Sequence, residues 1–397
     1  MTQTTKNTAK DYVIRVVDDP GAVGVESWNE LLAGQAAPTP FMRHEYLAAL
    51  QTSGSAVRAT GWQPQFLLLE ADGVLQAACA LYLKSHSYGE YVFDWAWADA
   101  YRRHGLSYYP KLLGAVPFTP VPGTRLLARS DLWRQRLVQA LGAMAHQQQW
   151  SSAHLLFIDD NDRQALADAG WLLREGVQFH WEQDATKPVA DFTDLLSRLQ
   201  RDKRKKIQQE QRRVAEQGVR FTAYAGTTIT PGLWNFFYRC YTLTYQAHHS
   251  TPYLTQDFFA CMAQSMPEHW VMFVARRNDE PVAASLIAVD AASRTAWGRY
   301  WGCVEPLPCV HFDACYYQPL AWCLTHGYTR FEGGAQGEHK MARGLLPVAT
   351  HSAHWLRDPR FAAAVADFLS AEGQGVEQYV DELRERSPFK KGPGPGV

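Results

Sequence analysis

The chain has 397 residues, of which 46% are hydrophobic and 20% are charged, and its formal net charge is -1 at pH 7. This composition supports a sizeable core in two or three domains, and it excludes an overall charge that would attract nucleic acid or an anionic surface. No apolar run is long enough to span a bilayer, and residues 1–12 lack the apolar stretch of a signal peptide, so we expect a cytoplasmic protein. Its seven cysteines are expected to be reduced thiols.

The first half of the chain alternates predicted strands and helices after a flexible lead at residues 1–11. Asp72 and Gly73 form a hairpin turn signal, and Ser130 can cap the helix that follows it. Period-two patterns predict strands at residues 13–17, 65–70, 74–85, 90–98, 154–158 and 171–181. Helices are predicted at residues 25–32, 44–51 and 131–148, with a helical turn at 108–115.

The second half repeats this order of elements. Strands are predicted at residues 270–277, 281–289, 295–303 and 328–332, and a helix at 311–325 that ends at Gly327. A tyrosine pair follows a long aromatic strand in each half, at residues 108–109 and 316–317. The matching order indicates a duplicated α/β unit.

A basic segment, residues 198–213, separates the two halves. It carries eight basic and two acidic residues, and Leu199, Ile207 and Val214 lie near helical spacing, which predicts a helix with a thin apolar stripe. Its charge is suited to phosphate groups of a tRNA or a nucleotide-linked substrate, although no aromatic residue is present to stack on bases. The alternative is a solvated helix face. The residues expected to contact phosphate are Lys203, Arg204 and Lys205.

Several long aromatic segments carry a resemblance to a known family. They are residues 61–64, 82–101, 108–112, 300–303, 311–317 and 333–344. These segments resemble the Fem-type, peptidoglycan-biosynthesis-like N-acyltransferases of the GNAT superfamily. The resemblance implies an α/β fold of two tandem GNAT-like domains, at residues 12–190 and 218–371, with a basic helical arm at 191–217 between them and a helical, then disordered, tail at 372–397.

The resemblance also implies an activity. Relatives transfer an acyl or aminoacyl group directly to an amine, from acyl-CoA or aminoacyl-tRNA as co-substrate, so a small-molecule or peptide amine, a possible tRNA partner and no bound cofactor or metal are expected. One loop departs from the usual GNAT pattern. Residues 304–310, where a glycine-rich loop would hold the CoA pyrophosphate, contain Pro306 and Pro308 and no glycine. Two backbone amide donors are therefore missing.

The loop after the strand at residues 328–332 is the first candidate for chemistry. Acyl transfer to an amine needs a base, and Glu332 or Glu338 can serve if burial raises the pKa of its carboxyl group. Lys340 and Arg343 are suited to an anionic part of donor or acceptor. The alternative is an exposed charged loop without chemistry. Other residues expected at the substrate are Tyr300, His311, Tyr316, Gln336 and His339.

A second set of candidates lies in the first half, at Asp94, Trp95, Trp97, Asp99 and Tyr101. On the predicted strand the last four share one face and Asp94 takes the other. The set is interpreted as an aromatic groove in which an aspartate holds an ammonium group, or alternatively as core packing between domains.

Three further alternatives remain open. His311 and Cys315 share a helix face, so Cys315 is either a thiolate nucleophile or a packing thiol. The cysteine spacing in residues 303–323 does not match a zinc site. A non-catalytic protein that recognises a cell-wall precursor or peptide in an aromatic cleft is the main rival to the transferase, and binding without turnover would distinguish it.

Overall fold

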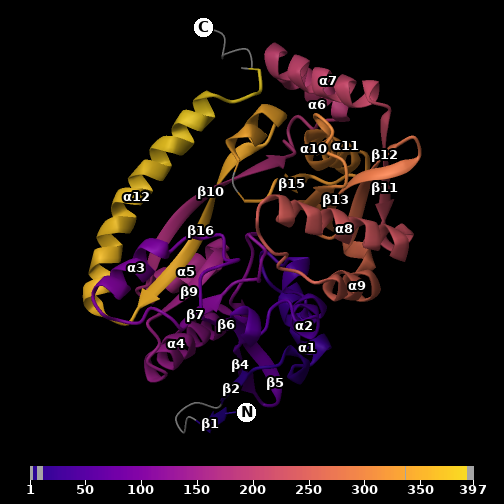
Figure 1. The fold of residues 1–397 in the computed structure, drawn as a ribbon. Coiled ribbons are helices and arrows are strands. Elements are labelled where there is room, and N and C mark those ends of the chain that lie inside the picture. Colours follow the sequence, from indigo (N-terminus) through magenta and orange to yellow (C-terminus); the bar gives the residue numbers. More distant parts are fainter. Residues whose placement is uncertain (1–2, 7–11, 336, 391–397) are drawn as a thin grey trace. The chain divides into compact units, whose positions relative to one another are not determined.

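The computed structural model describes residues 3–6, 12–335 and 337–390. The chain divides into two compact units (Figure 1). Unit 1 comprises Met1–Gly176, Tyr253–Phe258 and Ala349–Glu377, and unit 2 comprises Val177–Pro252, Phe259–Val348 and Gln378–Val397. Residues 391–397, which belong to the tail predicted to be disordered, lie outside the described residues. The predicted flexible lead contains strand β1 (Gln3–Lys6) between residues that the structure does not describe.

Unit 1 contains an antiparallel sheet in the order β1-β2-β4-β5-β8. Asp72 and Gly73 both have positive φ, 51° and 75°, as the predicted tight turn between β4 and β5 requires. The predicted strand at residues 74–85 is two strands, because β5 ends at Cys79 and β6 then pairs in a different sheet. The bounds are β2 (Val13–Val17), β4 (Phe66–Ala71), β5 (Val74–Cys79), β8 (Leu127–Ala128), α1 (Val25–Ala33) and α2 (His44–Thr52).

Further strands of unit 1 pair in the order β16-β9-β7-β6-β3. The β7–β9 pair is parallel and the others are antiparallel. The predicted strand at 154–158 and the helix at 131–148 are confirmed, and Ser130 caps that helix by accepting from the Trp133 amide. The bounds are β3 (Trp62–Pro64), β6 (Leu81–Lys84), β7 (Lys111–Gly114), β9 (Ser152–Ile158), β16 (Leu346–Leu356), α4 (Asp131–Gln147) and α5 (Asp160–Asp168).

The core of unit 1 is aliphatic. Leu81, Leu112 and Leu155 come from neighbouring strands, and Leu137 and Leu141 from α4 cover them; all five are fully buried. At about 25 cal/mol per Å² of apolar area removed from water, this burial is the main favourable contribution to folding. The strands therefore form a rigid base for the polar side chains at their ends.

Two predictions in unit 1 are wrong. Residues 90–98 were expected to be a strand, but the structure has a loop followed by helix α3 (Trp95–Arg103). Alternating alanines gave this segment a period-two pattern, yet alanine is the strongest helix former, and Trp97 and Tyr101 are buried at helical i, i+4 spacing. Residues 108–115 were expected to be a helical turn, but they contain strand β7, whose four residues are all buried.

Unit 2 contains the strand order β11-β12-β13-β14-β15-β10. Pairing is antiparallel except between β14 and β15, which are parallel. The predicted strands at 171–181, 270–277, 281–289 and 295–303 are confirmed within two residues. The bounds are β10 (Leu172–Glu182), β11 (Val219–Ala225), β12 (Trp270–Arg277), β13 (Glu280–Asp290), β14 (Thr295–Cys303) and β15 (Arg330–Glu332).

The predicted helix at 311–325 is present but not uniform. It consists of α10 (Val310–Phe312), a π-helical turn (Asp313–Tyr317) and α11 (Gln318–Thr325), and Gly327 follows with φ of 74°. Pro319 lacks the N–H that an α-helical bond to residue 315 needs, which accounts for the wider turn just before it. Tyr316 and Tyr317 lie in this turn, whereas the other tyrosine pair precedes β7, so the two pairs are not structurally equivalent.

The basic segment forms parts of two helices rather than one. α6 (Phe192–Arg198) ends where Leu199 takes an extended conformation, and α7 (Arg201–Glu216) follows. Ile207 and Val214 are buried on one face of α7, so its predicted amphipathic character is confirmed. Helix α8 (Pro231–Ala247) packs so closely on β14 that a Cβ at Gly302 would lie 2.1 Å from the Cys240 carbonyl oxygen. The other helices are α9 (Gln256–Ser265) and α12 (Pro359–Glu385).

Candidate functional site

Glu332 ends strand β15 in unit 2 and is buried, with 4% of its surface exposed. Its Oε1 atom lies 3.0 Å from Nε of Arg330, and its Oε2 atom lies 3.9 Å from Nε2 of His180. Burial raises the pKa of this carboxyl group to about 7, although the Arg330 charge opposes the rise. Burial lowers the pKa of His180 to about 3, so this imidazole is neutral at pH 7. Glu332 therefore exchanges its proton near neutral pH.

Glu338 occupies a different environment. Its side chain is 49% exposed, Arg386 Nη1 donates to its Oε1 over 3.0 Å, and the Tyr379 hydroxyl donates to its Oε2 over 3.4 Å. The 3₁₀ turn that carries it, Glu338–Arg343, begins after Gly337. Of the two carboxylates expected from the sequence, Glu338 is in a surface ion pair and Glu332 is in the interior.

The two cations of this loop are buried and already hydrogen-bonded. Lys340 Nζ donates to the carbonyl oxygens of Gly334 and Ala335, each over 3.0 Å, and burial lowers its pKa to about 8. Arg343 Nη1 donates to the His339 carbonyl over 2.7 Å, and its guanidinium lies 3.7 Å from the Phe312 ring centre. Both side chains fix the shape of the loop. Gln336 lies outside the described residues.

Aromatic and imidazole side chains line the neighbouring helix. The Tyr316 hydroxyl and Nε2 of His339 are 3.2 Å apart. Desolvation, and the nearby His339 and Arg343, lower the pKa of His311, although this residue is exposed at the surface. Burial raises the pKa of the Cys315 thiol far above its ordinary value, which disfavours a thiolate nucleophile there. Tyr300 packs among aromatic rings of α8 and α9 in unit 2, including Tyr241 and Phe259.

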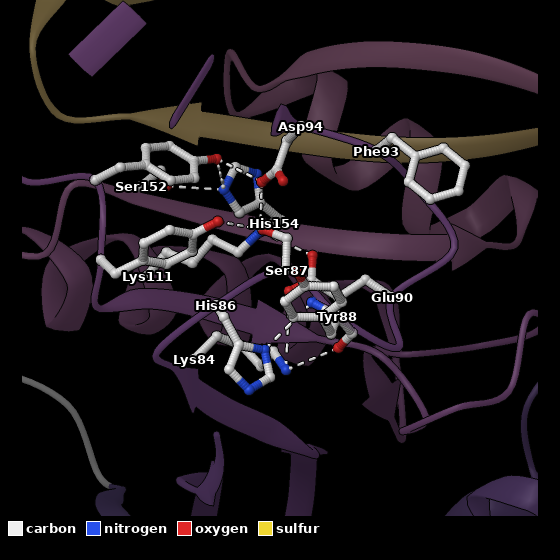
Figure 2. A network of polar contacts seen from close by, with 12 residues as sticks. Lys84, His86, Ser87, Tyr88, Glu90, Phe93, Asp94, Lys111, Ser152 and His154 are labelled. Carbon is white, nitrogen blue, oxygen red and sulfur yellow. Dashed lines mark hydrogen bonds and ion pairs between the residues drawn. The ribbon is translucent and has the colours of Figure 1, made fainter. Parts of the chain in front are cut away.

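The candidates of unit 1 do not share a face. Trp97 and Tyr101 are buried, whereas Trp95 is 41% exposed, because all three are on helix α3 and not on a strand. Asp99 forms ion pairs at the surface with the two arginines of the last helical turn. Asp94, which precedes the helix, enters a buried hydrogen-bond network (Figure 2). Trp97 and Tyr101 pack against this network through ring contacts with His354 and Tyr108.

That network is centred on two lysines that sequence reasoning missed. Lys84 on β6 and Lys111 on β7 are register partners, and both side chains are fully buried. Lys111 Nζ donates to Ser87 Oγ and to Glu90 Oε2, each over 2.8 Å, and also to Asp94. Lys84 Nζ makes one longer hydrogen bond of 3.3 Å, to the carbonyl oxygen of residue 88. The two cations thus differ in how completely they are satisfied (Figure 2).

The four charged groups of the network form two pairs with different electrostatics: Lys111 with Asp94, and Lys84 with Glu90. Burial acts on all four groups, but the Lys111 ammonium holds the pKa of Asp94 well below its usual range, and Glu90 and Asp94 raise the pKa of Lys111. Burial dominates for the other two groups. It raises the pKa of Glu90 to about 7 and lowers that of Lys84 to about 7.

A histidine pair extends the network. Ser-Ala-His occurs at residues 152–154 on β9 and at 352–354 on β16, and the two histidines are register partners with their Nδ1 atoms 2.8 Å apart. The Tyr108 hydroxyl joins them to Asp94, since it donates to the carboxylate over 2.6 Å and lies 3.1 Å from Nε2 of His154. Burial lowers the pKa of both imidazoles, that of His154 to about 3. The repeated tripeptide is a signal in the sequence that could have pointed to these two histidines.

Among the residues that the structure describes, no group of three or more His, Cys, Asp or Glu side chains is placed to hold a metal ion. Within the same residues, every helix is too short or too polar to cross a lipid bilayer.

Comparison with known proteins identifies the family. Residues 21–391 match the FemAB_like family, described as peptidoglycan biosynthesis/recognition, and the chain belongs to it. The fold is similar to that of FemX, with a TM-score of 0.54 and 10% identity over 87% of this chain and 98% of FemX. It is also similar to L-PGS from Bacillus licheniformis, with a TM-score of 0.54 and 12% identity over 89% of this chain and 98% of that one. No curated protein matches by sequence. The predicted family and the predicted two-domain α/β fold are both confirmed.

Proposed function

We propose that this protein transfers an acyl or aminoacyl group from an activated donor to an amine, with Glu332 as the base that deprotonates the amine. Membership of the FemAB_like family and the likeness to the folds of FemX and L-PGS support a transferase. The observation that carries the proposal is the buried carboxylate of Glu332, whose pKa is raised to about 7. With this pKa roughly half of the carboxyl groups are ionised at pH 7, so the group can both accept and hold a proton.

The reaction divides into a proton transfer and an acyl transfer. An alkyl ammonium has a pKa near 10, so an amine acceptor arrives protonated and cannot attack. Glu332 takes this proton, the free amine attacks the acyl carbon, the new C–N bond forms, and the bond to the donor's oxygen or sulfur breaks. The leaving group takes up a second proton, which the nitrogen loses as the amide forms, and Glu332 releases the first proton to solvent. Arg330, 3.0 Å from Oε1, acts as a positioning residue that orients the carboxylate.

Two donors are compatible with the described residues, and they make different demands. Acyl-CoA would have to bind at residues 304–310 without a glycine-rich loop, where Pro306 and Pro308 cannot donate. Aminoacyl-tRNA would use the polar face of α7, where Lys205 and Lys206 are exposed. The lost amide donors in the first case favour the aminoacyl-tRNA donor.

The test is transfer of a labelled aminoacyl group, or a labelled acetyl group from acetyl-CoA, to an amine acceptor by the full chain. Glu332→Gln keeps the size of the side chain and removes the proton acceptor, so kcat/KM should fall by about 10² to 10⁴. The matched control is Glu338→Gln, whose carboxylate lies in a surface ion pair and should be dispensable. Equal activity of Glu332→Gln and wild type would remove the proposed base. Binding of the substrates without any turnover would instead favour a binding protein.

A further inference from the structure

The acidic loop of unit 1, residues 85–94, buries its two carboxylates and exposes two of its aromatic side chains. Glu90 and Asp94 are buried against the lysines of β6 and β7, whereas Tyr88 and Phe93 are 58% and 53% exposed (Figure 2). The lysines are fixed by a sheet whose strands pair along their length, and their counter-ions are on a segment without helix or strand. If one part of the cluster moves, it is therefore the carboxylates.

Glu90 is an incomplete partner for Lys84. Its Oε1 atom is buried without a hydrogen bond, and it lies 4.0 Å from Lys84 Nζ, beyond hydrogen-bonding distance. The Trp62 ring lies 3.5 Å from the same ammonium, and its indole N–H is buried without an acceptor. Lys84 and Trp62 thus present donors that the closed protein does not fully use. Natural proteins rarely leave such groups unsatisfied in the interior, so these two require an explanation.

The charge balance indicates the sign of a ligand. The closed cluster holds two lysines and two carboxylates, so their charges balance. A charged ligand that enters would leave an unpaired buried charge unless it replaces a protein group of the same sign. The lysines cannot leave the sheet. Asp94 accepts hydrogen bonds from both Lys111 and Tyr108, whereas within the described part of the chain Glu90 accepts from Lys111 alone. Glu90 is the group that an incoming anion can displace most readily.

We propose that Lys84 and Lys111 form a binding site for an oxyanion of a substrate, either a carboxylate or a phosphate, and that Glu90 occupies this site until the ligand displaces it. The ligand would take donors from Lys84, Lys111 and Ser87. Glu90 competes with the ligand and keeps the site neutral when it is empty. This site lies in unit 1 and does not depend on the base proposed in unit 2.

Gly89 gives an independent way to perturb the closed loop. Its φ is 81°, and a Cβ there would lie 2.6 Å from Cδ1 of Phe118. Gly89→Ala should therefore push the acidic loop away from its closed position without changing any charge. Glu90→Gln should open the same site by removing the competing charge while keeping the size of the side chain. Two variants with different physical effects should then give the same result.

The experiment is calorimetric titration of the full chain with inorganic phosphate and, separately, with acetate. Glu90→Gln and Gly89→Ala should each bind one of these anions roughly tenfold more tightly than wild type, the factor expected if about a tenth of the wild-type protein has an open loop. Lys84→Met combined with Glu90→Gln should abolish binding. Tighter phosphate binding identifies a phosphate ligand, and tighter acetate binding identifies a carboxylate. Glu45→Gln, a carboxylate paired with Arg43 elsewhere in unit 1, is the control and should bind as wild type.

A second measurement on the wild-type protein covers the case in which a variant does not fold. Hydrogen exchange should show the amides of residues 85–94 opening far more often than those of β6 and β7. Exchange of this loop only through global unfolding would overturn the proposal, because Glu90 could not leave. So would folded Glu90→Gln and Gly89→Ala proteins that bind neither anion better than wild type. In both cases the cluster would be a structural ion-pair network, and the transferase proposal for Glu332 would be unaffected.

Discussion

Replacement of Glu332 by glutamine should change how the stability of the protein depends on pH. The folded protein raises the pKa of this carboxyl group from 4.5 to about 7 because burial penalises its charge. That difference corresponds to about 3 kcal/mol between the ionisation free energies of the folded and unfolded states. For an acid whose folded pKa is raised, the unfolded chain gives up its proton first. The wild-type protein therefore loses this stability as pH rises from 4.5 through 7.

The assay is urea unfolding of wild type and Glu332→Gln at pH 5 and at pH 8, with the free energies of unfolding compared at each pH. Glutamine carries no charge at either pH. The free energy of unfolding of the variant, relative to that of the wild type, should therefore be up to about 3 kcal/mol higher at pH 8 than at pH 5. Glu182→Gln is the matched control, since it removes an exposed carboxylate that also pairs with Arg330 and should change stability by about 0–1 kcal/mol. A difference between wild type and Glu332→Gln that stays constant with pH would refute the reasoning, because it would mean that burial does not perturb this group.

Two other expectations can be measured directly. Gly302→Ala should destabilise unit 2 by about 1–3 kcal/mol or more in urea unfolding, because the new Cβ would overlap the Cys240 carbonyl. Gly142→Ala, in the interior of α4 with open space around it, should stabilise the protein by about 0.5–1 kcal/mol. The reverse order of stabilities would contradict the packing described. Neutralising Lys205 and Lys206 on the exposed face of α7 should weaken tRNA affinity. It should also make the slope of log affinity against log salt concentration shallower by about two, because about two fewer counterions are released. An unchanged slope would exclude α7 from tRNA binding.

The sequence predicted the strand at residues 295–303 with the observed bounds, because Trp297, Tyr300 and Trp301 are aromatic residues, which favour strands. The segment at residues 90–98, in contrast, was predicted wrongly. Its alternating alanines imitate a strand, and only tertiary packing of Trp97 and Tyr101 shows that the period is helical. Leu199 could not be recognised as a break between two helices, since its extended conformation depends on pairing with Phe389, 190 positions away.

The candidate sites show a different limit. The sequence placed two glutamates near one loop and could not choose between them, because only the fold buries Glu332 and leaves Glu338 beside Arg386. Lys84 and Lys111 were missed because a buried lysine is rare and nothing in the chain marks its counter-ion in advance. Each carboxylate partner follows from the path of the loop that joins β6 to α3, which no local pattern encodes.

The histidine pair of β9 and β16 has a consequence for synthesis of the chain. Strand β9 is complete at Ile158, but its antiparallel neighbour is supplied by residues 351–356. A ribosome must therefore add almost two hundred residues while one edge of β9 has no such neighbour, and an open edge is a template for wrong pairing. The nascent protein would benefit from a chaperone over this interval, and a product that stops before residue 349 would expose His154 and a hydrophobic edge to aggregation.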